Sequence, residues 1–295
     1  MKNTQIAALA ISIALSYSSA AGVCQSLEPQ PEIRFRLVRD TVIVISMMAN
    51  NQGPFAFVFD TGADTTIVDP SLASKLSLAP LRRIQQTTLA GVQTLPVSLV
   101  ATLAAGPAHA NGLPVLIQDL SELRKLDPQI EGIVGQDFLS HFNYLLDYRK
   151  RCVRFERDDE IRSAIDGDRL AIETVDHRMI VPVEMRSGGV ARVRLLLDSG
   201  ANSLVLMRKS SQALNLAAQA NWLEATSSGH IGLRVGTIQT LTVGSQEFRN
   251  ISVAVTASEA TEQIGDGLLP MALFRVLYIN NREGFVVFNL RVKED

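Results

Sequence analysis

The sequence has few of the residues that build metal and redox centres. Of its 295 residues, 4 are histidine and 2 are cysteine. The histidines, His109, His141, His177 and His230, are scattered along the chain, whereas zinc ligands usually come in close pairs. We therefore expect no metal and no other cofactor.

The chain also lacks an excess of positive charge and the common nucleotide-binding loops. Its net charge is −2, which gives nucleic acid no basic surface to bind, so we expect no nucleic-acid partner. The patterns G-x-x-x-x-G-K-[ST], G-x-G-x-x-G and G-x-S-x-G do not occur. Hydrophobic residues make up 46% of the chain, enough for one large domain or two of ordinary size.

Long apolar runs are missing too, and the one near the start is short. Residues 6–15, IAALAISIAL, follow Lys2 and precede small residues, with Ser18 and Ala20 at the spacing of a cleavage site. This order predicts a signal peptide over residues 1–20. The mature protein would be periplasmic or secreted, with no stable membrane span.

Two other interpretations of the N-terminus remain open. The apolar run could act as an uncleaved membrane anchor, although it is short for that role. Cys24 could carry a lipid, although the residue before it is Val23, whereas known lipidation signals have Gly, Ala or Ser at this position. Export would also allow Cys24 to pair with Cys152, but two cysteines give no disulfide framework.

One stretch of the sequence occurs twice. Residues 59–69 read FDTGADTTIVD, and residues 195–206 read LLLDSGANSLVL. A second block, EGIVGQDFL at 131–139, is answered by DGLLPMALF at 266–274. The two copies lie too far apart in the sequence for a solenoid repeat, and they indicate two homologous lobes.

Most of each lobe is typical of β-strands. Runs such as VIVISMM, FAFVF, RVRLLL and ISVAV are short, rich in β-branched residues and bounded by Gly, Pro, Asn or Asp. We predict a mainly β protein whose two lobes, residues 32–157 and 168–293, are related by a pseudo-two-fold axis. Residues 158–167 form the predicted linker.

The repeated stretch carries a carboxylate at the end of an apolar strand in each lobe. The two triplets are Asp60-Thr61-Gly62 and Asp198-Ser199-Gly200. A pseudo-two-fold axis would place them face to face, with the glycines allowing tight turns and the hydroxyls pinning the loops together. Two carboxylates ~3 Å apart cannot both ionise, so they would share one proton.

This pattern resembles the retropepsin-like and pepsin-like aspartic proteases, in particular bacterial members with both lobes on one chain. Ile133-Val134-Gly135 resembles the element that crosses behind the catalytic loop in that family. The resemblance implies hydrolysis of peptide bonds in a peptide or protein substrate. Asp60 and Asp198 would activate a water molecule as general acid and base.

The same resemblance implies further site residues. Ala63, Asp64, Ala201 and Asn202 follow the triplets where these enzymes bind the substrate. Mobile flaps would come from hairpins near residues 87–94 and 227–234, which carry Gly91, Gly229 and Gly232. Neither stretch contains the tyrosine found in pepsin flaps.

Pro270 departs from the family pattern, because it stands where the second downstream glycine is expected. Proline fixes φ and removes a donor, so this lobe would support its loop differently. The alternative function is therefore a catalytically inactive protein that binds extended peptides on the same fold. Retention of both complete triplets favours the active enzyme.

We expect signal cleavage after Ala20 or Ala21, because the charged, apolar and small-residue segments follow in that order. N-terminal sequencing of protein from the periplasm or medium checks this. Cytoplasmic protein that still begins at Met1 would contradict it.

Overall fold

The computed structural model describes residues 32–88, 91–156, 161–162, 165–216, 220–226, 229–256 and 265–292. These residues are mostly in β-strands, as predicted. The predicted signal peptide and Cys24 lie outside the described residues. Cys152 is buried and forms no disulfide within the described part of the chain.

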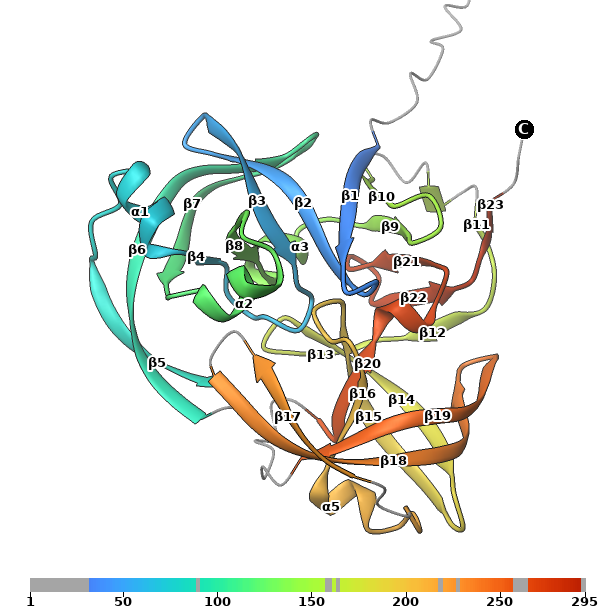
Figure 1. Cartoon of the computed structure of the whole chain (residues 1–295). Coiled ribbons are helices and arrows are strands. Elements are labelled where there is room, and N and C mark those ends of the chain that lie inside the picture. Colours follow the sequence, from blue (N-terminus) through green and yellow to red (C-terminus); the bar gives the residue numbers. More distant parts are fainter. Residues whose placement is uncertain are drawn as a thin grey trace, which may run out of the picture.

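Each half of the chain builds a curved sheet with the same order of strands (Figure 1). In the N-terminal half the order is β1-β2-β3-β8-β4-β7-β6-β5, and in the C-terminal half it is β13-β14-β15-β20-β16-β19-β18-β17. Additional pairings of β2 with β6 and of β14 with β18 fold each sheet back on itself. The repeat in the sequence is therefore also a repeat in topology.

The strands of the N-terminal sheet have the following bounds: β1 Ile33–Val38, β2 Val42–Ala49, β3 Gln52–Phe59, β4 Ile67–Val68, β5 Arg82–Thr88, β6 Gly91–Ala105, β7 Ala108–Ile117 and β8 Ile130–Val134. Those of the C-terminal sheet are β13 Glu173–Val175, β14 Arg178–Arg186, β15 Val190–Asp198, β16 Leu204–Met207, β17 Ala220–Thr226, β18 Gly229–Val243, β19 Gln246–Thr256 and β20 Gly267–Pro270.

A shared sheet joins the two halves at their base, in the order β12-β22-β21-β9-β10-β1. Its remaining strands are β9 Tyr144–Asp147, β10 Cys152–Phe155, β12 Arg169–Ala171, β21 Val276–Asn280 and β22 Phe285–Phe288. The halves meet where β9 pairs with β21, with Leu146 opposite Leu277. This sheet therefore takes strands from both halves. The limits of the two lobes stay a prediction.

Two more short strands form a separate small sheet. It joins β11, Ile165–Asp166, to β23, Arg291–Val292, so the stretch predicted as a linker contains a short strand. Helices are few and short: α1 Pro70–Lys75, α2 Ser121–Leu126, α3 Gln136–Leu139, α5 Arg208–Ser211 and the 3₁₀ turn η2 Met271–Leu273. Within the described ranges no helix has the length and apolarity to cross a membrane.

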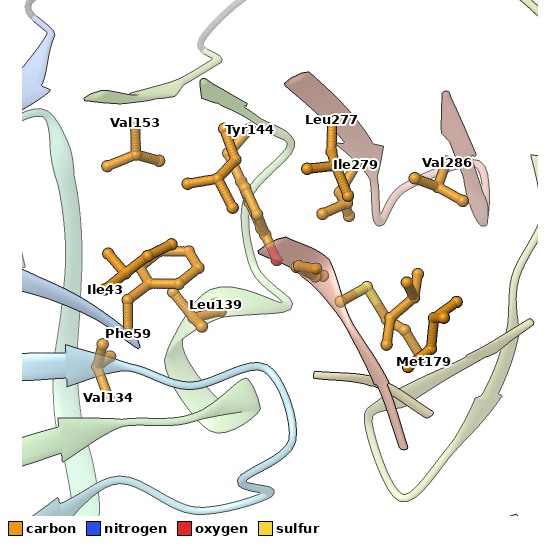
Figure 2. Packing of buried hydrophobic residues seen from close by; sticks show 14 of the residues in the cluster. Ile43, Phe59, Val134, Leu139, Tyr144, Val153, Met179, Leu277, Ile279 and Val286 are labelled. Carbon is orange, nitrogen blue, oxygen red and sulfur yellow. The ribbon is translucent and has the colours of Figure 1, made fainter. Parts of the chain in front are cut away.

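The largest hydrophobic cluster runs through both lobes and the base sheet. Figure 2 shows Phe59 and Val134 of the N-lobe, Tyr144 of the base sheet and Met179 of the C-lobe within it. Phe59 and Tyr144 pack edge to face, with ring centroids 5.5 Å apart. The strands that lead to the two triplets are therefore anchored in one continuous core.

Candidate active site

The two triplets begin where β3 and β15 end. In each lobe this strand lies parallel to the strand of the second repeated block, β8 or β20, and the backbone N–H of Asp60 donates to the carbonyl of Val134 at 3.0 Å. Along β15 exposed and buried residues alternate until Leu195, after which every residue is buried. The strand thus carries its final carboxylate, Asp198, into the interior between the lobes.

Thr61 and Ser199 join the two triplets by four reciprocal hydrogen bonds. The Thr61 hydroxyl donates to the Leu197 carbonyl at 2.8 Å and accepts from the backbone N–H of Ser199 at 3.0 Å. In the mirrored pair, the Ser199 hydroxyl donates to the Phe59 carbonyl at 2.7 Å and accepts from the backbone N–H of Thr61 at 3.0 Å. Both side chains are buried, so these bonds fix the loops relative to each other.

Gly62 and Gly200 let the two carboxyl groups approach. A Cβ on Gly62 would lie 2.6 Å from Cγ of Asp198, and a Cβ on Gly200 would lie 2.8 Å from Cγ of Asp60. Each glycine therefore faces the carboxyl group of the opposite triplet, where no side chain fits. The reason for glycine here is this close approach between the lobes.

Both carboxyl groups accept backbone hydrogen bonds and lie within hydrogen-bonding reach of each other. Oδ1 of Asp60 accepts from the N–H groups of Gly62 and Ala63, at 2.9 and 3.2 Å. Oδ1 of Asp198 accepts from those of Gly200 and Ala201, at 2.7 and 3.0 Å.

Burial raises the pKa of both aspartates. For Asp60 the backbone hydrogen bonds and the positive charge of Arg178 oppose the rise. For Asp198 the neighbouring charge of Asp60 adds to burial, and its pKa lies well above the usual range. The arrangement therefore favours a pair that keeps one proton between its two members.

Arg178, which begins β14 in the C-lobe, was not predicted from the sequence. Its Nη2 lies 3.4 Å from Oδ2 of Asp64, and its Nε donates to the Gly62 carbonyl at 3.1 Å. Gln86 on β5 donates to the other carboxylate oxygen of Asp64 at 3.0 Å. Asp64 thus links its own loop to the opposite lobe and to the neighbouring hairpin.

The other predicted residues lie on the same loops and on two hairpins. Ala63 and Ala201 pack against apolar clusters in their lobes, and Asn202 is exposed. Gly91 and Gly232 belong to hairpins in which β5 pairs with β6 and β17 pairs with β18. The hairpins exist where flaps were expected, while their movement and the substrate-binding roles stay predictions.

Pro270 is accommodated by a matching change elsewhere in its lobe. In the N-lobe the N–H of Gly135 donates to Oγ1 of Thr66 at 3.2 Å. In the C-lobe Pro270 pairs with Asp198 in the parallel register and has no N–H to donate. The position that matches Thr66 is Leu204, which is buried and needs no donor. Proline therefore leaves no acceptor unpaired.

A separate cavity of about 500 Å³ lies on the N-lobe, beside Ser46, Pro54 and Pro128. It contains none of the predicted site residues. We place the candidate site at the two triplets, because paired carboxyl groups and their backbone hydrogen-bond donors converge there. Among the described residues, no cluster of three or more histidine, cysteine or acidic side chains could hold a metal.

The reciprocal bonds between the triplets predict a large stability effect. Thr61→Val keeps the shape but leaves the Leu197 carbonyl and the Ser199 N–H unpaired, so we expect the free energy of unfolding to fall by about 2 to 4 kcal/mol. Thr61→Ser keeps the hydroxyl and should cost less than about 1.5 kcal/mol. Urea unfolding measures both.

Ser98→Ala is the matched control, because Ser98 is also buried and donates one hydrogen bond, to the Ala79 carbonyl, away from the lobe junction. We expect it to cost about 1 kcal/mol. A Thr61→Val cost no larger than that of Ser98→Ala would show that the bonds between the triplets do not hold the lobes together.

The sequence also matches a known protein family. A family model described as "Aspartyl protease" matches residues 45–138 and again residues 181–273, and these two regions together span more than half of the chain. No curated protein matches the sequence. A retropepsin-like aspartic protease from Rickettsia conorii is similar to 44% of this chain and 94% of its own, with 16% identity and a TM-score of 0.32. On the strength of the repeated family match, the chain belongs to the aspartyl protease family.

Proposed function

We propose that the protein is an aspartic endopeptidase that hydrolyses peptide bonds with Asp60 and Asp198. The observation that carries this proposal is the pair of carboxyl groups between the lobes, Asp198 buried and Asp60 half-buried, each facing a glycine of the other lobe. In such a pair the ionised carboxylate accepts a proton from the attacking water, and the protonated partner donates to the carbonyl of the substrate. Neither a metal nor a covalent intermediate is required for this chemistry.

The surroundings of the pair support the same reaction. The N–H donors on each loop hold one oxygen of each carboxyl group, which orients the carboxyl planes before the substrate arrives. The β5–β6 and β17–β18 hairpins are the elements we propose as flaps over an extended peptide. An extended peptide suits them because strand edges bind backbone groups.

Asp60→Asn and Asp198→Asn should each lower kcat/KM by at least about 100-fold, because the pair works as a unit and either change removes one proton-transfer role. The measurement is digestion of a mixed peptide library, with products identified by mass spectrometry. Asp168→Asn, an exposed change next to the base sheet, is the control and should leave the rate unchanged.

Different outcomes separate an enzyme from a peptide-binding relative. Near-normal turnover in one asparagine variant would refute the shared-proton site. Wild-type protein that binds peptides but cuts none at any pH would support the inactive binding protein instead.

The pH dependence follows from the direction of the pKa changes. Since burial raises both pKa values, the pair keeps its shared proton to a higher pH than a free carboxyl group would. Activity needs one proton, so it should fall at low pH as a second proton binds and at high pH as the shared proton leaves. We expect a bell-shaped profile of kcat/KM that peaks in weak acid.

Ala63→Ser and Ala201→Ser test what limits this range. A serine hydroxyl can donate to the adjacent carboxylate and favour its charged form, so the basic limb should move to lower pH. Asp137, whose pKa burial raises to about 6, titrates in the same region, and an Asp137→Asn profile separates its contribution. A basic limb that stays in place or rises in both serine variants would show that the alanines do not set the range.

A further inference from the structure

The two lobes surround their triplets with different charges. Beside the N-lobe triplet, Asp64 is neutralised by Arg178, whose side chain is 9% exposed. At the matching C-lobe position the carboxylate is replaced by the neutral Asn202. A peptide lying between the lobes would therefore meet the ion pair of Asp64 and Arg178 on one side and the uncharged Asn202 on the other.

A pocket of about 310 Å³ opens beside Asn202 and Ser203. Its apolar wall comes from Leu233 and Val235 on β18, an arm of the hairpin that we propose as a flap. Ala254 on the neighbouring strand β19 also lines it. The pocket thus adjoins the loop that follows the C-lobe triplet and shares two lining residues with the hairpin proposed as a flap.

One residue that lines the pocket is smaller than its counterpart in the N-lobe. Val235 pairs with Ala254 on neighbouring strands, and the corresponding N-lobe pair is Val97 with Leu116. Leu116 is 1% exposed and packs into an apolar cluster of the N-lobe. Alanine in place of this leucine leaves more room at this point of the pocket lining.

The rim of the pocket carries a positive charge. Arg39 lies in the turn between β1 and β2 of the N-lobe, is exposed and lines the pocket together with Thr41. Within the part of the chain that the structure describes, no carboxylate forms an ion pair with Arg39. Asp40 is also exposed but does not line the pocket.

We propose that this pocket is a substrate subsite that binds an acidic side chain of the peptide. The inference rests on the proposed peptide-binding function of the same cleft. The aliphatic part of a glutamate would lie on Leu233 and Val235 while its carboxylate faces the Arg39 guanidinium. Because the matching N-lobe environment is already neutralised, the preference applies to one side of the scissile bond only.

The test compares peptides that differ only by Glu, Gln or Lys at each position around a mapped cleavage site. Wild type should prefer Glu over Gln by about threefold to fivefold at one position, and the preference should shrink at high salt. Arg39→Gln should remove the preference, and Arg39→Glu should turn it toward Lys. Peptides with amidated C-termini distinguish a side-chain carboxylate from a terminal one.

Two further variants sharpen the comparison. Asn202→Asp copies Asp64 and should weaken the preference for Glu, since its carboxylate would neutralise Arg39. Arg151→Gln is the matched control, because Arg151 is also an exposed turn arginine with a similar φ, 52° against 51° for Arg39, and lies away from the pocket. A Glu preference that is absent, or that survives Arg39→Gln unchanged, would overturn the proposal.

The subsite can also be tested by peptide binding, without catalysis. If wild type cuts no peptide, the proposed endopeptidase activity fails, and binding of the same peptides is then measured by fluorescence anisotropy. A Glu-over-Gln difference in Kd that depends on Arg39 supports the subsite in that case. Equal Kd values for the two peptides refute it.

Discussion

The reciprocal hydrogen bonds of Thr61 and Ser199 are the constraint on which the site depends. Each hydroxyl both donates to a carbonyl before the opposite triplet and accepts from an N–H within it, so neither loop can shift alone. Because these groups are buried, separating them would leave polar atoms unpaired. The spacing of the two carboxyl groups follows from this junction.

Duplication on one chain allows the two lobes to differ where an identical pair could not. Gly135 and Thr66 in one lobe correspond to Pro270 and Leu204 in the other. Gly135 donates its N–H to Thr66, whereas Pro270 has no N–H and Leu204 has no side-chain acceptor. The charge pair of Arg178 with Asp64 likewise contrasts with the neutral Asn202, which stands at the position that matches Asp64. The two triplets stay symmetrical while the surfaces beside them diverge.

The sequence predicted the elements that recur in it and missed those that occur once. The two triplets were predictable because the same local pattern appears twice, and the mainly β fold because the chain has many short runs rich in β-branched residues. Arg178 was missed because its counterpart in the strand register is the apolar Val42, so no repeated polar signal marked it. The effect of Pro270 was not predictable either, since it depends on Leu204, a residue distant in sequence that only the fold brings near.

The base sheet has a consequence for how the chain folds. Strand β9 lies between β10 of its own half and β21 of the other, and the pairing of Asp147 with Val276 closes a very long loop of chain. Contacts between residues so distant in sequence form slowly, because the entropy of closing the loop must be overcome first. During synthesis the N-terminal half therefore exposes the edge of β9 until the last strands emerge, and an unpaired edge is where one chain can wrongly join another.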